Sequence, residues 1–376
     1  MSITIGFDAK RIVRNATGLG SYGRTLVNDL LRSSSDDWSF RLYAPDEGRE
    51  DLRRQVADHP RLTFCYPEDS SLFWRTCGIV KNLRRDGVQI YHGLSGELPL
   101  GIRKSGIRSI VTIHDLIFLR HPEYYGWLDA RIYAWKFRRT VREADLIIAI
   151  SECTKRDIIE LGHVPEEKIR LVYQSCSTWF KQHAGDDQRQ KVNARYLLPS
   201  RYIIHVGTVE ERKNILLAVK ALPLLPSDLH LIVVGRQKPY VRKVLSEAER
   251  LGVDSRVHFL QGVPNADLPA LYQMAEACVY PSRYEGFGIP IIEAIQSGLP
   301  VVACTGSCLE EAGGPHSLYV DPDDPDALSR ALLQVLKGAE GRDERIRQSH
   351  EYVRRFEGTD VASQVLQLYE ELLSYR

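Results

Sequence analysis

The sequence lacks the features that mark several common classes of protein. It has no apolar run of the 18 or more residues that cross a membrane as a helix, and no basic segment followed by an apolar one at its N-terminus, as a secretory signal would have. Its 50 lysine and arginine residues face 49 aspartate and glutamate residues, so the formal net charge is only +1. That balance gives no basic field for nucleic acid. We therefore expect a cytoplasmic protein that binds no nucleic acid.

Cysteine is too scarce and too scattered for a disulfide framework. The seven cysteines are an odd number, and the one close pair, Cys304 and Cys308, has no pair of histidines near it in sequence. Such spacing is typical of free thiols in a reducing compartment rather than of a metal or redox centre.

Short apolar, β-branched runs alternate with helical patterns along the whole chain. Continuously apolar strands indicate burial on both faces, and strand–helix alternation indicates parallel sheets, so the fold class is α/β. At roughly 100–200 residues per domain, 376 residues predict two domains. We expect strands at residues 3–7, 88–92, 109–113, 146–150, 170–173, 202–206, 229–234, 257–260, 277–280 and 300–303.

A polar stretch at residues 177–198 separates two predicted strands and is the expected domain boundary. Near the C-terminus, a helical pattern at 358–376 follows another at 343–356 with no strand between them. The last helix is therefore expected to leave its own sheet and dock elsewhere.

Glycines at 18, 20 and 23 form a nominal G-x-G-x-x-G, the fingerprint of dinucleotide binding. That motif should follow its strand at once, whereas the first strand ends near Asp8, about ten residues earlier. We therefore disfavour a dehydrogenase. A glycine-rich loop before a helix still lets the backbone approach an anion or a bulky ligand, although an ordinary flexible turn explains the glycines as well.

Polar residues follow two of the predicted strands in the first half of the chain. His114 and Asp115 come directly after the strand at 109–113, and ligands of parallel sheets bind outside the carboxyl ends of strands. Both are site candidates, although a histidine at a strand end is often structural. Ser151 follows the strand at 146–150 and is expected to cap the next helix.

In the second half, Gly207 turns the chain after a strand, and Arg212 and Lys213 then open the next helical pattern. Cations at a helix N-terminus do not complement the helix dipole. Binding of a polyanion such as a diphosphate would account for these two cations. The alternative is that both charges are simply solvated.

The most informative segment is a strand that ends at Pro281, followed by a Gly-Phe-Gly loop and a helix that starts near Pro290. Glu285 lies on the loop, and Glu293 is expected in the first helical turn. Loop N–H groups there would hold a phosphate while the two carboxylates accept hydrogen bonds from sugar hydroxyls. A glutamate in a first turn is also favourable for the helix alone.

These segments resemble the retaining nucleotide-sugar glycosyltransferases of family 4. The resemblance rests on TGLGSYGR, TIHDL, ADLIIAISE, VGTVEERKN, YEGFGIPIIEA, SGLPVVA and LYVDP in this order. It implies the GT-B fold, two facing Rossmann-like domains with parallel sheets and a C-terminal helix that crosses back to the first. An acceptor-side domain would then comprise residues 1–178 plus 358–376, and a donor-binding domain residues 179–357.

The resemblance also assigns roles to the candidate residues. Arg212 and Lys213 would hold the donor's diphosphate, Glu293 the ribose, and Glu285 the transferred sugar. His114 would contact the donor sugar from the first domain, while Gly18 and Gly20 close over the phosphates. The remaining expected substrate-binding residues are Asp115, Gly207, Phe287, Gly288 and Ile289.

The function so implied is transfer of a hexosyl group, mannose first, from a nucleotide-sugar to a glycan or lipid-linked acceptor with retention of configuration. The alternatives are a nucleotide-sugar epimerase and a non-catalytic nucleotide-sugar binding protein. No cofactor or metal is expected, because Asp321 and Asp323, a formal D-x-D pair, precede a helix that such acids merely cap.

A helical pattern at 127–142 combines five basic residues with four aromatic ones. Basic amphipathic helices of this kind lie in anionic membrane interfaces, which predicts peripheral contact with the inner face of the plasma membrane. The alternative is that the aromatic rings pack on the sheet and the arginines are solvated.

Overall fold

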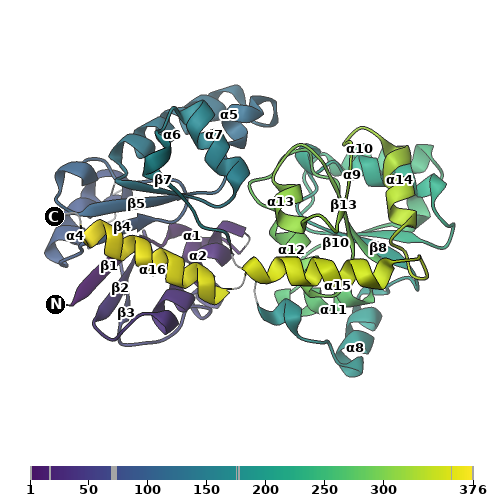
Figure 1. The fold of residues 1–376 in the computed structure, drawn as a ribbon, viewed down its shortest axis with the longest axis horizontal. Helices are drawn as coiled ribbons and strands as arrows, with labels where there is room; N and C mark the ends of the chain where they lie inside the picture. The colour runs from purple at the N-terminus through teal and green to yellow at the C-terminus, as the bar shows by residue number, and fades with distance from the viewer. Residues whose placement is uncertain are drawn as a thin grey trace. The chain divides into compact units, whose positions relative to one another are not determined.

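The computed structural model describes residues 2–16, 18–68, 74–174, 176, 178–356 and 358–374. The chain divides into two compact units, one formed by Met1–Ser175 with Phe356–Arg376 and the other by Cys176–Arg355. Each unit is a parallel sheet covered by helices, as Figure 1 shows. The α/β fold class predicted from the sequence is confirmed.

The first unit contains a seven-stranded sheet in the order β3-β2-β1-β4-β5-β6-β7, with all neighbours parallel. The chain starts in the middle, winds outward through β2 and β3, and returns to place β4 against the other side of β1. The strands are β1 (Ile3–Asp8), β2 (Trp38–Tyr43), β3 (Leu62–Cys65), β4 (Ile90–Gly93), β5 (Arg108–Ile113), β6 (Leu146–Ala149) and β7 (Ile169–Leu171).

Helices cover both faces of this sheet, because each face carries its own apolar cluster. One cluster joins the sheet to α2 and α16, and the other joins it to α4, α6 and α7. The helices are α1 (Lys10–Arg14), α2 (Gly18–Ser33), α3 (Glu50–Arg53), η1 (Trp74–Gly78), α4 (Ile79–Arg85), η2 (Ile102–Lys104), α5 (Ile117–Arg120), η3 (Pro122–Tyr124), α6 (Trp127–Glu143), α7 (Glu152–Gly162), η4 (Glu166–Lys168) and α16 (Gly358–Ser374).

The C-terminal helix α16 belongs to the first unit although the second unit precedes it in sequence. It lies beside α2, where the yellow helix of Figure 1 runs next to the purple one. Val365 and Tyr369 are fully buried there, and the Tyr369 hydroxyl lies 2.7 Å from Nδ1 of His92 on β4. The predicted return of this helix to the first domain is confirmed.

The second unit has a six-stranded parallel sheet in the order β10-β9-β8-β11-β12-β13. Its strands are β8 (Tyr202–Val206), β9 (His230–Val234), β10 (Val257–Leu260), β11 (Ala277–Tyr280), β12 (Val301–Cys304) and β13 (Leu318–Val320). Its helices are η5 (Thr178–Lys181), α8 (Asp186–Tyr196), η6 (Glu211–Lys213), α9 (Ile215–Ala221), η7 (Leu222–Leu224), α10 (Val241–Arg250), η8 (Asp254–Arg256), η9 (Asn265–Asp267), α11 (Leu268–Met274), α12 (Ile289–Gln296), α13 (Leu309–Gly313), α14 (Pro325–Leu333) and α15 (Arg342–Val353), and η10 (Arg354–Phe356) leads back to the first unit.

Both sheets reverse their winding direction at one place, between β1 and β4 in the first unit and between β8 and β11 in the second. Loops on the two sides of such a switch point diverge and leave a crevice beyond the carboxyl ends of the strands, where ligands of doubly wound sheets bind. The topology therefore gives one expected ligand position in each unit.

Candidate active site

At the switch point of the second unit, Gly207 follows β8, and the loop that carries Glu285 follows β11. Arg212 and Lys213 lie on the short helix η6, and α9 begins only at Ile215. The prediction that these cations open the helix itself is wrong, because Asn214 adopts a left-handed conformation, φ 53°, and separates the two elements. The cations therefore lie on a separate short turn before α9 and not in the first turn of α9.

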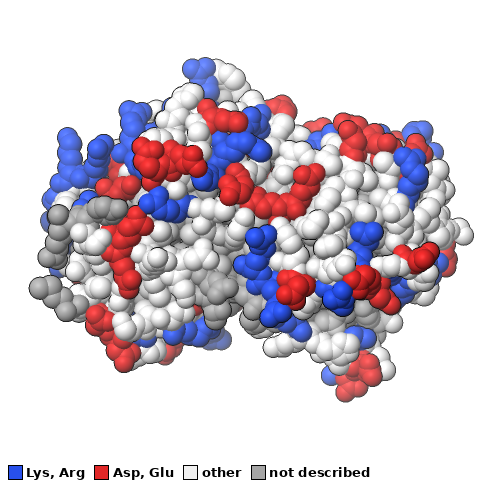
Figure 2. Space-filling model, in the orientation of Figure 1, with Lys and Arg blue, Asp and Glu red and all other residues white. Residues whose placement is uncertain are grey.

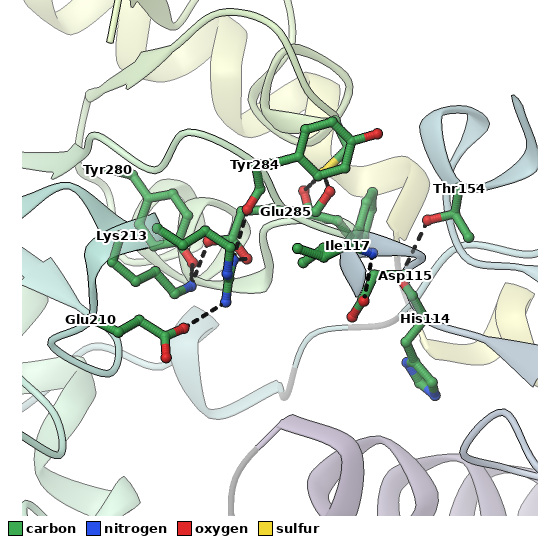
Figure 3. Close-up of polar contacts among 12 residues, drawn as sticks. His114, Asp115, Ile117, Thr154, Glu210, Lys213, Tyr280, Tyr284 and Glu285 are labelled. Carbon is green, nitrogen blue, oxygen red and sulfur yellow. Dashed lines mark hydrogen bonds and ion pairs between the residues drawn. The ribbon is translucent and has the colours of Figure 1, made fainter. Parts of the chain in front are cut away.

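Glu285 joins both cations. Nη1 of Arg212 lies 2.7 Å from Oε2 of Glu285, and Nζ of Lys213 lies 2.6 Å from its Oε1. Figure 3 shows Lys213 and Glu285 directed toward each other. Burial alone would raise the pKa of Glu285, but the attraction of Lys213 and Arg212 outweighs it and lowers the pKa to about 2. Glu285 is therefore an anion at any working pH.

Further side chains hold the two cations in place. Glu210 accepts a hydrogen bond of 2.8 Å from Arg212, and it also pairs with Lys238. Lys213 donates to the hydroxyl of Tyr280 at 2.7 Å. The cluster has three cations and two carboxylates, a formal charge of +1 within a mostly buried site. Such a site attracts an anion more strongly than the same charge would in open solvent.

The loop that carries Glu285 is fixed by hydrogen bonds and by close packing. The buried thiol of Cys308 donates to the backbone oxygens of Glu285 and Phe287, at 3.1 and 2.9 Å. Gly288 has φ 112° and a Cβ placed on it would lie 3.2 Å from Leu309, so only glycine suits this position. No side chain caps α12, which starts at Ile289, and its N-terminus carries partial positive charge.

Glu293 is the fifth residue of α12 and not part of its first turn, because the helix starts at Ile289. The prediction of an acid in the first turn is wrong, and a favourable interaction with the helix dipole therefore does not explain this residue. Its carboxylate accepts a hydrogen bond of 3.2 Å from the hydroxyl of Tyr272. Burial raises the pKa of Glu293 to about 7, against the opposing effect of that hydrogen bond.

In the first unit, His114 is held at both ring nitrogens. Its Nε2 lies 2.8 Å from the backbone oxygen of Leu94, and its Nδ1 lies 2.6 Å from the amide nitrogen of Gln174. Burial lowers the pKa of His114 to about 4, so the ring is neutral, donates through Nε2 and accepts through Nδ1. The Asp115 carboxylate accepts from the backbone N–H of Ile117, which starts α5.

Ser151 caps α7, as predicted, through a hydrogen bond that its hydroxyl accepts from the N–H of Thr154. The glycines of the first unit lie elsewhere than predicted: Gly18 is the first residue of α2, and Gly20 and Gly23 lie within the helix rather than on a loop before it. A Cβ on Gly20 would lie 1.8 Å from the backbone oxygen of Asn15, so close packing against the preceding turn requires glycine there.

A second charged cluster, which the sequence did not reveal, lies at the switch point of the first unit. Asp8 ends β1 and is buried, and it pairs with Arg75 of η1 at 2.5 Å. Arg75 also pairs at 2.5 Å with Glu97, beyond β4, and Glu97 lies 3.2 Å from Nζ of Lys136 on α6. We call Asp8, Arg75, Glu97 and Lys136 the first-unit cluster.

Comparison with known proteins finds a matching family model for each half of the chain. Residues 17–178 match the family model of Glycosyltransferase Family 4, and residues 188–352 match that of Glycosyl transferases group 1. The chain is 30% identical over 287 residues to O-antigen chain mannosyltransferase B of Escherichia coli, an alignment that covers 75% of this chain and 74% of that protein. The chain belongs to this glycosyltransferase family.

The glycosyltransferase is also 28% identical over 347 residues to the GDP-mannose-dependent alpha-(1-6)-phosphatidylinositol monomannoside mannosyltransferase of Mycolicibacterium smegmatis, covering 85% of each chain. Sucrose-phosphate synthase from Thermosynechococcus elongatus superposes with a TM-score of 0.79 at 20% identity over 100% of both chains. Anabaena HepE in complex with UDP and glucose gives 0.75 at 16% identity, over 99% of this chain and 100% of that one.

These likenesses identify the fold of the glycosyltransferase as GT-B, built from two Rossmann-like units. Members of the family are retaining hexosyltransferases, so the chain is an enzyme of that class. The predicted family is confirmed, and neither a dehydrogenase nor a non-catalytic binding protein is needed to explain the site.

Two further findings on the glycosyltransferase concern metal and membrane. In the part of the chain that the structure describes, no three His, Cys, Asp or Glu residues gather as metal ligands would. Of the predicted D-x-D pair, Asp323 pairs with Arg283 at 2.5 Å, and the helix cap is provided by the next acid, Asp324. None of the described helices is long and apolar enough to cross a membrane.

Glu293→Gln should stabilise the ligand-free glycosyltransferase under alkaline conditions. Because the pKa of Glu293 is raised to about 7 in the folded protein, ionisation of its carboxyl destabilises the fold. The free energy of unfolding is therefore unaffected at low pH and falls as pH rises from about 4.5 through 7. At about pH 9 the buried anion costs up to about 3 kcal/mol, which glutamine avoids. Urea unfolding at about pH 5 and 9 measures this: a gain confined to alkaline pH is expected, and an equal effect at both would contradict the assignment.

Proposed function

We propose that the glycosyltransferase moves a mannosyl group from GDP-mannose to a glycan or lipid-linked sugar acceptor, with retention of configuration. The observation that carries the proposal is the cation cluster at the second switch point, where Arg212 and Lys213 meet Glu285 within 2.7 Å. The choice of mannose is supported by two relatives, which are named as mannosyltransferases, one of them GDP-mannose-dependent.

In this proposal the donor's diphosphate lies against Arg212 and Lys213 and at the N-terminus of α12. The leaving nucleoside diphosphate gains negative charge as the glycosidic bond breaks, and fixed cations in a buried site stabilise that charge without reorganising. Both side chains are mostly buried and already oriented by Glu210, Tyr280 and Glu285. Catalysis then depends on a stabilised leaving group rather than on a strong protein base.

The sugar and the nucleoside would be held by the two glutamates. Glu293 as a carboxylate would accept hydrogen bonds from the ribose hydroxyls, and Tyr272 orients it. Glu285, with the backbone of Phe287 and Gly288, would contact the mannosyl group, and Cys308 fixes that backbone. Attack by the acceptor on the face that the diphosphate leaves accounts for retention, with a donor phosphate oxygen taking the acceptor's proton.

The acceptor would bind to the first unit. Its switch point carries the first-unit cluster, and carboxylates such as Asp8 and Glu97 accept hydrogen bonds from sugar hydroxyls. His114, neutral and fixed at both nitrogens, would contact the donor sugar through the edge or face of its ring rather than act as an acid.

The test is a donor screen with the purified full chain, in which release of nucleoside diphosphate is measured with GDP-mannose, UDP-glucose and UDP-galactose, each with and without a lipid-linked mannosyl acceptor. Acceptor-dependent release from GDP-mannose alone, with an α-linked product, is expected. Release from a UDP-sugar instead would overturn the choice of donor. Conversion of the donor to an epimer without transfer would show an epimerase.

Activity should survive an excess of EDTA. Two cations and a helix N-terminus face the proposed diphosphate position, so leaving-group charge is neutralised by the protein. The expected outcome is an unchanged initial rate after chelation and buffer exchange. Loss of the rate with EDTA and its return with Mg²⁺ or Mn²⁺ would contradict leaving-group stabilisation by Arg212 and Lys213 alone.

A further inference from the structure

One helix of the first unit exposes an unusual amount of apolar surface. Eleven large apolar side chains are exposed among the described residues, and five of them lie on α6. Trp127 is 73% exposed, Leu128 60% and Trp135 59%. Large side chains gathered in this way, unlike scattered ones, mark an interaction surface. The expectation that the aromatic rings pack inward on the sheet holds only for Phe137, which is buried.

Three of the exposed apolar residues of α6 form one stripe. Leu128, Ile132 and Trp135 follow at spacings of four and three, so they lie above one another on the helix. The opposite side packs on the sheet through Ala134, Phe137, Thr140 and Val141. These buried residues attach α6 to its unit, whereas the residues of the outward stripe are exposed.

Arginines border the stripe. Arg131, Arg138 and Arg142 are exposed and recur at spacings of seven and four, which places them along one edge of it. The Arg131 guanidinium lies 5.1 Å from the centre of the Trp127 ring. The acids of the helix, Asp129 and Glu143, are fewer than its basic residues.

The positive surface continues past the end of α6. Glu143 accepts a hydrogen bond from the backbone N–H of Arg103, which brings η2 with its exposed Arg103 and Lys104 to the C-terminal end of the helix. In Figure 2, Lys and Arg side chains predominate along the upper left margin of the first unit, next to the place of α6 in Figure 1.

We propose that this stripe, Leu128, Arg131, Ile132, Trp135, Arg138 and Arg142, together with Trp127 beside Arg131, docks the protein on an anionic lipid surface. Tryptophan is favoured at the boundary between lipid headgroups and acyl chains, and arginine beside it pairs with lipid phosphates. A second copy of the chain fits the stripe less well, because self-association about a two-fold axis would bring the same arginines together.

The position of α6 connects this surface with the first-unit cluster. Lys136 pairs with Glu97 at 3.2 Å, and Nη2 of Arg139 donates to the backbone oxygen of Leu98 at 2.8 Å. The helix is therefore tied to the loop after β4, at the switch point of the sheet. If the proposed function is right, a lipid-linked acceptor in the docked membrane would be held close to that cluster. Docking itself requires neither donor nor acceptor.

The test is co-sedimentation of the full chain, without any nucleotide-sugar, with vesicles of phosphatidylcholine alone and of phosphatidylcholine mixed with phosphatidylglycerol. Binding to the anionic vesicles only, reversed by high salt, is expected. Each basic residue near an anionic surface contributes about a fivefold factor in binding, so Arg138→Glu with Arg142→Glu should weaken it by about 25-fold or more. Trp127→Ser with Trp135→Ser should weaken it as well, because the apolar contact is lost.

Arg242→Glu with Lys243→Glu is the matched control, since both residues are exposed on α10 of the second unit and the charge change is the same. This variant should bind vesicles as the wild type does. Equal loss of binding in the control and in the α6 variants would show that net charge alone attracts the protein, and it would overturn the proposal. The proposal would also be overturned if the α6 variants bound as the wild type does, or if the wild type did not bind. A wild-type dimer that the tryptophan variant abolishes would assign the stripe to a second copy instead. All variants should melt as the wild type does, and with a water-soluble acceptor their turnover reports the transfer activity separately.

Discussion

The double variant Arg212→Ala with Lys213→Ala should lose nearly all transferase activity. Both cations contact one carboxylate, at 2.7 and 2.6 Å, so they share the position that the donor's diphosphate would take. Loss of one charged hydrogen-bond partner costs about 1.5–3 kcal/mol, or about 10–150-fold in rate. The two effects should not multiply, because residues that act on the same group act as a unit. Steady-state kinetics measures the loss of rate in the single and double variants, and a binding assay measures their affinity for nucleoside diphosphate.

Lys238→Ala is the matched control for that experiment. Lys238 belongs to the same cluster and carries the same charge, but its partner is Glu210 and its side chain is 45% exposed. It should keep most of the turnover. The double variant leaves Glu285 buried without its partners, so its thermal unfolding must be checked. The conservative variant Arg212→Lys keeps a cation at this position, and we expect it to fold and to retain part of the rate. Unchanged affinity of the double variant for nucleoside diphosphate would contradict the role of the two cations.

Most of the strands that sequence alone predicted are buried on both faces, although the edge strands β7 and β10, which are mostly half-buried, were predicted as well. β8 and β11 have the predicted bounds, and each is an apolar run in the middle of its sheet. β2, β3 and β13 were missed because polar or half-buried residues interrupt them. In β2, half-buried Ser39 and Arg41 alternate with buried residues, while β3 and β13 are edge strands with little full burial. A strand with one open side or edge needs no continuous apolar run.

The candidate residues near strand ends could be predicted because a parallel sheet collects its carboxyl ends at one edge. Which side chains meet there could not be predicted. Arg75 and Asp8 are 67 residues apart in sequence, and no local pattern links them. Tyr272 and Cys308, which orient Glu293 and the Glu285 loop, come from elements outside the recognised motifs. Both pairings arise from tertiary packing alone.

Glu285→Gln should separate binding from turnover. In the ligand-free protein the carboxylate neutralises both cations, so an arriving diphosphate has to displace or share it. Removal of that charge should leave the affinity for nucleoside diphosphate unchanged or increase it. Turnover should fall by about 10–150-fold, because the charged hydrogen bond to the transferred sugar is lost. Measurement of kcat, KM and nucleoside diphosphate Kd for the one variant tests both halves.

The control for this last experiment is Glu210→Gln, which removes a carboxylate from the same cluster at 2.8 Å from Arg212 without touching Lys213. It should also increase nucleotide affinity, but it should keep turnover, because Glu210 has no proposed contact with the sugar. The pKa of Glu285, about 2, keeps its charge constant across the working pH range, so the loss in Glu285→Gln should not depend on pH. By linkage, the stability that this lowered pKa provides is present above about pH 4.5 and disappears as pH falls toward 2. Equal losses of turnover in both glutamine variants would mean that Glu285 acts only by arranging Arg212, and its proposed contact with the sugar would be wrong.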